Sequence, residues 1–326
     1  MRFMILLSVC VACAMSMTVR AQEPEGPAAL LEDWKDAARD RTIPIKIDYA
    51  KTIDKPTPVV IISHGLGGSR EGLAYIGQYW AEHGYVAVHL QHPGSDSTLW
   101  KGLPPGAGMQ AMKKGMTVEQ FSARIEDVKF ALDELKRRND DPSWALHGKL
   151  NLDQIAMAGH SFGAITTQAM CGETFPNGKS FFDPRIKVGI AFSPSPPPGG
   201  DSKTAFASIT IPIFYWTGTN DTAPSTISSL KAIQRREPFD ATAKNDAYLV
   251  ILTDGDHMVF NGRLTEQPDE RPNDTVWHDL IEKGTTAFLD KYLKRDAAQG
   301  KYLDDGAFAK EIEPKGTYEM KKGEGK

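Results

Sequence analysis

Apolar and polar residues follow two different periods along this chain, and together they predict alternating strands and helices. Positions 43–50 are apolar at every second residue, which is typical of an edge strand with one exposed face. Continuous apolar runs predict buried strands, and apolar residues at helical spacing predict the helices between them. The expected buried strands cover 58–62, 85–90, 150–158, 187–192, 211–216 and 247–252, and the expected helices cover 69–83, 117–138 and 275–293. We therefore expect the α/β class, with a mostly parallel central sheet and helices on both faces.

Three segments lie outside this alternation. Residues 1–21 have a basic start, an apolar stretch and a small-residue cleavage site ending at Ala21, so we expect a signal peptide and no spanning helix. This leader predicts a secreted or periplasmic protein, and a lipoprotein anchored through Cys10 or Cys13 is the less favoured alternative. Residues 22–40 then form an N-terminal lead-in and 41–295 a single α/β domain. Residues 296–326 are charged and almost without large apolar groups, which predicts a disordered tail.

Composition limits the partners. With 326 residues, 40% of them hydrophobic, the chain can bury one large core. The formal net charge is −4 and neither sign gathers in one folded segment, so we expect no nucleic-acid partner. The oligomeric state does not follow from the sequence.

A short glycine-flanked stretch, Gly159-His160-Ser161-Phe162-Gly163, follows the expected strand 150–158 and precedes a helical pattern. On a sharp strand-to-helix turn this pattern predicts a nucleophile elbow, with the serine in strained backbone and glycines where side chains would clash. An ordinary serine in a glycine-rich loop is the alternative, because the pattern by itself is short.

A nucleophilic serine needs a histidine as base and an acid that orients this histidine. In the elbow arrangement the acid and then the histidine follow the serine along the chain, in loops after late strands. Asp221 is the carboxylate after 211–216, and His257 is the histidine after 247–252. A turn residue is the alternative role for each of them, and Asp201 is the reserve acid. Ser161, Asp221 and His257 are therefore the candidate catalytic residues.

The reaction also needs two N–H groups to hold the oxyanion that forms on the attacked carbonyl. The residue after the nucleophile, Phe162, is one candidate donor. Residues 63–68 are glycine-rich and follow the strand 58–62, and Leu66 is the second candidate, with His64 expected to hold the loop by a hydrogen bond.

Two other patterns favour structure over ligand binding. The loop 63–68 lacks the lysine and the spacing of a phosphate loop. His89, His92 and Asp96 could be metal ligands, but residues three apart on a strand point to opposite faces. We therefore expect no metal and no cofactor.

Substrate selection is expected in segments 91–115 and 258–274, which would border the carboxyl end of the sheet. Trp100, Met109, Met112 and Phe260 are the candidate substrate-binding residues. Methionines would suit a pocket that accepts varied acyl chains, and packing of the loop is an equally good explanation. The sequence does not show whether the two segments form a mobile lid.

These motifs resemble those of a known superfamily. The chain looks like an α/β-hydrolase of the group that contains the plasma-type platelet-activating-factor acetylhydrolases and bacterial predicted dienelactone-hydrolase-like proteins. It is more distantly similar to the cutinase-like polyester hydrolases. The resemblance covers about residues 41–293 and rests on Ser63-His64-Gly65-Leu66-Gly67-Gly68, His83-Gly84-Tyr85-Val86-Ala87-Val88, His92-Pro93-Gly94 and Gly159-His160-Ser161-Phe162-Gly163. It implies Leu66 and Phe162 as the N–H donors.

Two departures limit what this resemblance implies. In the acetylhydrolases the acid follows an earlier strand, where this chain has no carboxylate at 193–198, and segment 218–224 is more similar to the cutinase-like acid loop. Dienelactone hydrolases proper use a cysteine nucleophile, whereas Ser161 stands at the elbow here. The fold and the reaction type are therefore implied, but the acyl chain length and the leaving group are not.

The resulting hypothesis is an exported serine hydrolase that cleaves carboxylic esters through an acyl-enzyme, such as short-chain acyl or phospholipid acetyl esters. Its activity should fall in acid, because a protonated histidine cannot accept the serine proton. Three alternatives remain: a transacylase with the same residues, an amidase or peptidase, and a non-catalytic binding protein on the hydrolase fold.

Overall fold

The computed structural model describes residues 26–104, 106–197, 199–262 and 273–324. The expected leader, 1–21, lies outside these residues, as does most of segment 258–274. Among the described residues, none of the helices has both the length and the apolar character that a membrane span requires.

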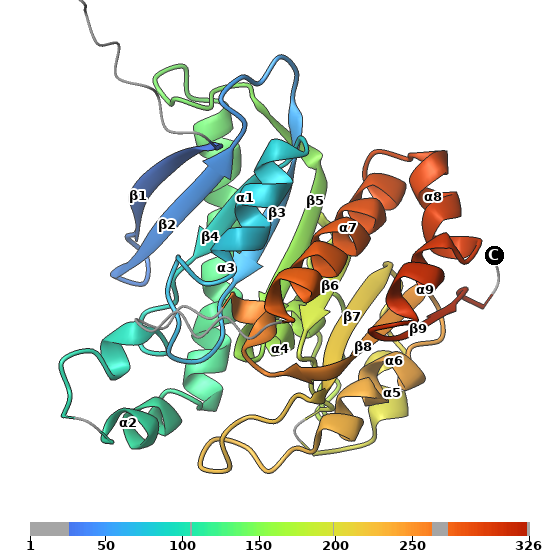
Figure 1. Cartoon of the computed structure of the whole chain (residues 1–326). Coiled ribbons are helices and arrows are strands. Elements are labelled where there is room, and N and C mark those ends of the chain that lie inside the picture. The colour runs from blue at the N-terminus through green and yellow to red at the C-terminus, as the bar shows by residue number, and fades with distance from the viewer. Residues whose placement is uncertain (1–25, 105, 198, 263–272, 325–326) are drawn as a thin grey trace, which may run out of the picture.

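One twisted sheet of the described residues runs through the molecule (Figure 1), in the order β1-β2-β4-β3-β5-β6-β7-β8-β9. Strands β3 to β8 pair in parallel, whereas β1, β2 and β9 are antiparallel to their neighbours. The strands are β1 (Ala28–Asp36), β2 (Arg41–Tyr49), β3 (Thr57–Ser63), β4 (Val86–Leu90), β5 (Leu150–His160), β6 (Ile186–Phe192), β7 (Ile213–Asn220), β8 (Ala247–Asp256) and β9 (Gly316–Lys321). The predicted mostly parallel sheet is confirmed.

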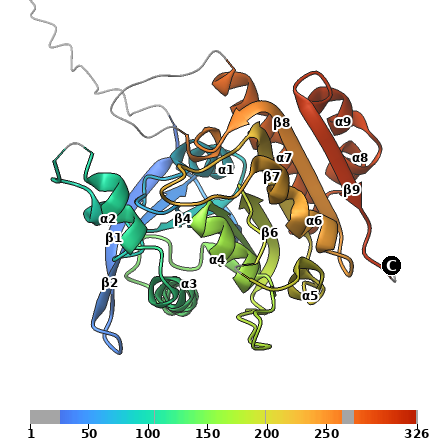
Figure 2. The ribbon, with the colours of Figure 1, turned by 90° about the horizontal axis from the view of Figure 1, so that it is seen from below.

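Helices cover both faces of this sheet (Figure 2), as predicted. Each face has its own apolar core. One core packs β-branched side chains against α3 (Val118–Asn139) and α4 (Phe162–Met170). The other packs against α1 (Ala74–Glu82) and α7 (Asp274–Tyr292). The shorter helices are α2 (Gly108–Lys114), α5 (Ser202–Phe206), α6 (Glu237–Ala241), α8 (Ala297–Asp304) and α9 (Ala307–Ile312), with 3₁₀ turns η1 (Ser97–Leu99), η2 (Ala232–Arg236) and η3 (Val259–Asn261).

Both ends of the described chain contribute to the sheet, which the sequence reading did not predict. The lead-in 22–40 contains β1, whose Trp34 is fully buried opposite Ile43 of β2. Most of the expected tail, 296–324, is ordered, because it forms α8, α9 and β9, and β9 pairs with β8. The prediction of disorder was wrong because the few large apolar residues of this segment lie on the buried sides of short helices. Leu303, Phe308 and Ile312 are fully buried there.

Removal of this C-terminal unit is expected to unfold the protein. A chain ending at Arg295 loses three fully buried apolar side chains, each contributing roughly 1.5–3 kcal/mol, and exposes the edge of β8. Since domains are stable by about 5–15 kcal/mol, we expect little soluble protein or a much lower melting temperature. A chain ending at Glu324, which retains β9, is the control. Equal melting temperatures for the two chains would restore the disordered-tail interpretation.

Candidate active site

Ser161 lies at the turn from β5 into α4, in a backbone conformation that non-glycine residues rarely adopt, with φ 56° and ψ −113°. The two glycines of the motif permit this turn. A Cβ on Gly159 would lie 2.3 Å from the carbonyl oxygen of Gly163, and a Cβ on Gly163 would lie 1.9 Å from that of Ser63. Strain of this kind is costly and persists where the surrounding fold enforces it, which is typical of a functional turn.

The loops after β7 and β8 bring the other two candidate residues to this serine, because these strands are parallel neighbours that end at the same edge of the sheet. His257 Nε2 lies 3.0 Å from Ser161 Oγ, and His257 Nδ1 lies 2.7 Å from Asp221 Oδ1. This network assigns the imidazole proton to Nδ1, where it is donated to the carboxylate, and leaves Nε2 to accept the serine proton. The structure thus joins the three residues in one chain of hydrogen bonds.

Asp221 is fully buried and ionised in this network. Burial by itself raises the pKa of this carboxyl, but the hydrogen bond from His257 and the positive charge of Arg235 outweigh burial and hold the pKa below its ordinary value. The Thr217 hydroxyl also donates to Asp221 Oδ2 at 2.8 Å. The carboxylate is therefore fixed in orientation and in charge.

Arg235, in η2, is a residue of the site that the sequence reading missed. It is 2% exposed, and its Nε lies 3.0 Å from Asp221 Oδ1 and donates to the Asp221 carbonyl at 2.8 Å. Its Nη1 donates to the carbonyls of Ser193 and Pro194, at 2.9 and 3.0 Å, in the segment after β6 that has no carboxylate. No local pattern marks this arginine, because its burial depends on three loops that meet only in the folded chain.

The glycine-rich loop after β3 lies against the elbow. A Cβ on Gly65 would be 3.5 Å from Ser161 Cβ. The neighbouring N–H groups of this loop are occupied, since Gly67 donates to the Ser95 carbonyl at 2.9 Å and Gly68 to the Gly65 carbonyl at 3.1 Å. Within the described part of the chain, the N–H groups of Leu66 and Phe162 have no acceptor. Both candidate donors are thus free to bind a ligand.

His160, next to Ser161, contacts the loop that carries His257. Its Nε2 lies 2.7 Å from the carbonyl oxygen of His257, and the two rings are 4.7 Å apart. Burial and the nearby His257 lower the pKa of His160 to about 3, so this ring is neutral and donates from Nε2. It therefore holds the loop that carries His257.

The candidate substrate-binding residues separate into two groups. Trp100 Nε1 donates to the Gly67 carbonyl at 2.7 Å, and a Cβ on Gly67 would lie 2.4 Å from Met112 Sδ, so these two side chains border the glycine-rich loop. Met112 belongs to α2, and Met109 lies half-buried on this helix too. Phe260 was wrongly chosen, because it is fully buried in the core, 5.9 Å from the ring of Phe192.

The remaining residues considered from the sequence, Asp201, His89 and His92, make structural contacts. Asp201, the reserve acid, caps α5 by accepting from Thr204 N at 2.9 Å and is far from buried. His92 lies between Ser63 and Asp127, and His89 lies beside Asp48 and the Gly72 carbonyl. Within the described residues no cluster of three or more potential metal ligands occurs.

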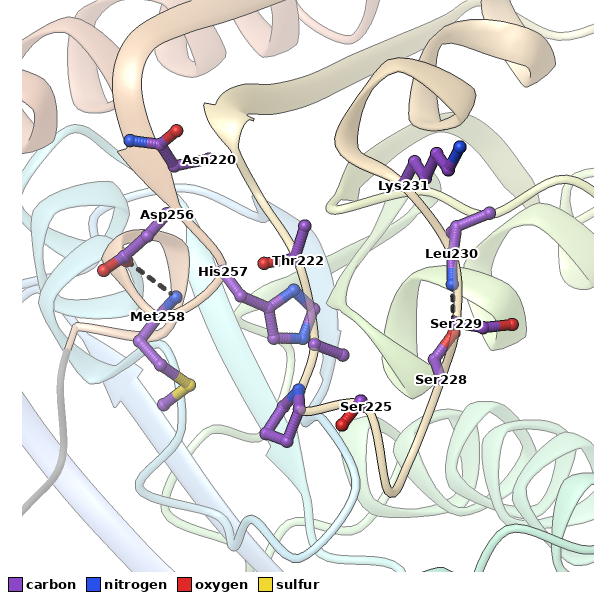
Figure 3. A pocket seen from close by; sticks show the side chains of 12 residues that line it. Asn220, Thr222, Ser225, Ser228, Ser229, Leu230, Lys231, Asp256, His257 and Met258 are labelled. Atoms are coloured by element: carbon purple, nitrogen blue, oxygen red, sulfur yellow. Dashed lines mark hydrogen bonds between the residues drawn. The ribbon is translucent and has the colours of Figure 1, made fainter.

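An open hollow of about 830 Å³ lies beside His257 (Figure 3). Its walls come from the loop after β7 and from the start of the loop after β8, and Figure 3 shows the imidazole among the surrounding side chains. The surface of the hollow is mostly apolar, and four of its lining residues carry a hydroxyl group. The lining residues are Asn220, Thr222, Ala223, Pro224, Ser225, Ser228, Ser229, Leu230, Lys231, Asp256, His257 and Met258.

Comparison with known proteins supports the resemblance seen in the motifs. Residues 37–101 match the family described as "Platelet-activating factor acetylhydrolase, isoform II". A platelet-activating factor acetylhydrolase of Bos taurus is 25% identical in an alignment 281 residues long, which covers 76% of this chain. The proteins of the same name from Canis lupus familiaris and Cavia porcellus are 23% and 24% identical, over 76% and 78% of this chain.

The predicted similarity to platelet-activating-factor acetylhydrolases is therefore confirmed. The matched region covers 60% of the length of the bovine and dog proteins and 62% of that of the guinea-pig protein.

Proposed function

We propose that this chain is a serine esterase that hydrolyses carboxylic esters through an acyl-enzyme. The observation that carries the proposal is the continuous hydrogen-bonded order Ser161, His257, Asp221, with the serine on a strained turn. The two free N–H groups of Leu66 and Phe162 beside this serine are its second support. The names of the relatives point to short acyl esters, with acetyl esters of phospholipids among them.

The proposed reaction has two halves. His257 Nε2 accepts the proton as Ser161 Oγ attacks the ester carbonyl, and the Leu66 and Phe162 N–H groups hold the oxyanion. His257 then gives the proton to the departing alcohol, which leaves the acyl group on Ser161. In the second half, His257 accepts a proton from water, the water attacks the acyl carbonyl, and the acid is released while Oγ regains its proton. Asp221 orients His257 and stabilises its protonated form.

A fluorophosphonate probe tests the proposal, because it phosphonylates an activated serine covalently. We expect one label per wild-type chain, no label on Ser161→Ala, and hydrolysis of p-nitrophenyl esters that falls as the acyl chain lengthens. Ser143→Ala is the matched control, since Ser143 lies in an exposed turn and bonds Asp141 at 2.7 Å. Labelling that persists in Ser161→Ala would contradict the nucleophile assignment. A wild type that neither labels nor hydrolyses any ester would favour a binding protein.

Acyl transfer to an alcohol is a second candidate. The observation that favours it is the open hollow beside His257, where four hydroxyl-bearing residues could hydrogen-bond an acceptor alcohol. The histidine that activates water would deprotonate the acceptor alcohol in the same position. Product analysis with glycerol separates the two reactions, because transfer produces acyl glycerol and hydrolysis the free acid. Export through residues 1–21 stays a prediction.

A further inference from the structure

A fully buried arginine, Arg124 of α3, lies directly beneath the glycine-rich loop. Its Nη1 donates to the His64 carbonyl at 2.7 Å, and its Nη2 lies 3.4 Å from the Gly65 carbonyl oxygen. Its Nε donates to Ser95 Oγ at 2.9 Å. Within the described residues, all of its hydrogen bonds go to the segment 63–65 and to Ser95. A buried cation is thus used to orient main-chain carbonyls.

The Gly65 carbonyl matters because it shares a peptide plane with the Leu66 N–H. In a planar trans peptide the C=O and N–H point in opposite directions. This carbonyl accepts hydrogen bonds from His64 Nδ1 at 2.6 Å and from the Gly68 N–H at 3.1 Å, and Arg124 Nη2 lies 3.4 Å from it on the side of α3. The Leu66 N–H therefore points away from the donors that hold the Gly65 carbonyl. Gly65 itself lies beside the elbow, where a Cβ on it would be 3.5 Å from Ser161 Cβ.

His64 is itself locked by a second Ser–His–Asp arrangement, which is sealed from solvent. Ser63 Oγ lies 2.9 Å from His92 Nε2, and His92 Nδ1 lies 3.0 Å from Asp127 Oδ2, with all three residues at 0% exposure. The His92 main-chain N–H donates to His64 Nε2 at 3.0 Å, so His64 carries its proton on Nδ1 and donates it to Gly65. Burial and the charge of Arg124 lower the pKa of His92 to about 4, and both act in the same direction on His64. Both histidines are therefore uncharged, and their hydrogen bonds hold the glycine-rich loop in place.

The same arginine reaches the second candidate donor. Its Cζ lies 4.3 Å from the centroid of the Phe162 ring, in cation–π geometry. Burial lowers the pKa of Arg124 to about 9, so the guanidinium is charged at neutral pH. One side chain therefore contacts both segments whose free N–H groups lie beside Ser161.

We propose that Arg124 is a positioning residue for the oxyanion site, which directs the Leu66 N–H through the Gly65 carbonyl and fixes Phe162 through its ring. This inference rests on the proposed esterase function. Its physical basis is that an oxyanion site works by preorganisation, so donors must already point at the place where charge develops.

The test compares the Arg124→Lys variant with the Arg138→Lys variant. The concentration of active sites is determined by titration with a fluorophosphonate, and kcat is calculated per active site. Lysine keeps the charge but lacks the planar set of donors that binds several carbonyls at once. We expect kcat for p-nitrophenyl acetate to fall on the order of 100-fold, with KM within about threefold. The affinity of a trifluoromethyl ketone, whose adduct with Ser161 places an oxyanion in the site, should fall by a similar factor.

Arg138 is a matched control on the same helix. It is ion-paired with Glu32 and Glu134 and lies 4.9 Å from the Trp34 ring centroid, remote from the elbow. We expect Arg138→Lys to keep kcat and ketone affinity within about twofold. A merely structural role of Arg124 would reduce the melting temperature or the titratable fraction and leave kcat per site and ketone affinity unchanged; that result overturns the inference.

If Arg124→Lys does not fold, Ser95→Ala decides, because it removes one acceptor of Arg124 and leaves the guanidinium in place. We expect kcat to fall about 2- to 10-fold with a parallel loss of ketone affinity, and unchanged values contradict the inference. A wild type without labelling or ester hydrolysis would overturn the esterase proposal and the inference together. An active wild type with an unaffected variant overturns the inference alone.

Discussion

Replacing Asp221 with asparagine is expected to lower kcat for ester hydrolysis by roughly 10⁴-fold, the loss that the same change causes in serine-protease triads. The carboxylate accepts the Nδ1 proton of His257 at 2.7 Å, and this leaves Nε2 free to take the proton of Ser161. An amide can donate to Nδ1 instead and favour the opposite tautomer, and it cannot stabilise the protonated histidine. KM should change much less, because Asp221 is buried behind the histidine.

The loss of charge also leaves Arg235 without its carboxylate partner, so folding must be measured beside activity. Unpairing a buried ion pair costs roughly 3–5 kcal/mol, which circular dichroism and the urea midpoint would show. Asp201→Asn is the control, because Asp201 only caps α5 and faces solvent. Full activity in Asp221→Asn, or a large loss in Asp201→Asn, would show that the acid was wrongly assigned.

A Gly163→Ala substitution is expected to remove activity and much of the stability. The added Cβ would lie 1.9 Å from the Ser63 carbonyl oxygen and 2.9 Å from that of His64, and both are main-chain atoms that no side-chain rotation can move. The start of α4 must then separate from the glycine-rich loop. This displaces Ser161 and Leu66 relative to each other, and a misplacement of about 1 Å can cost on the order of 100-fold in rate.

Gly300→Ala is the matched control, since it is also a glycine in a helix. The nearest atoms to its added Cβ are in ordinary contact at 3.7 Å or more, so alanine should stabilise α8 by about 0.5–1 kcal/mol. Melting temperatures and kcat for both variants are the measurements. A Gly163→Ala protein with normal activity would mean that the elbow and the loop do not pack as described.

The meeting of Ser161, Asp221 and His257 in space was predictable, because it follows from the positions of the strands that precede them. Buried strands are marked by continuous apolar runs, and parallel neighbours end at the same edge of the sheet. The loops that carry Ser161, Asp221 and His257 had therefore to converge once the strands were correctly assigned. Their hydrogen-bonded contact agrees with that expectation, while their catalytic roles stay proposals.

Residues whose role depends on burial were not predictable. Arg124 and Arg235 read as ordinary basic residues of polar segments, yet each is buried and donates to the carbonyls of loops distant in sequence. Phe260 reads as a loop residue near His257, but the start of its loop turns back into the core. A one-dimensional pattern records local periodicity and cannot show which distant carbonyls will need a donor.

By itself the sequence determined the fold class and which residues are proposed as nucleophile, acid and base, because these follow from local periodicity and chain order. Only the tertiary structure decided that residues 296–324 form two helices and the edge strand β9 of the sheet. It also decided that Arg124 and Arg235 are buried and donate to the carbonyls of loops at the candidate site. These are properties of contacts between segments far apart in the chain, where burial turns a few apolar or charged side chains into fixed parts of the fold.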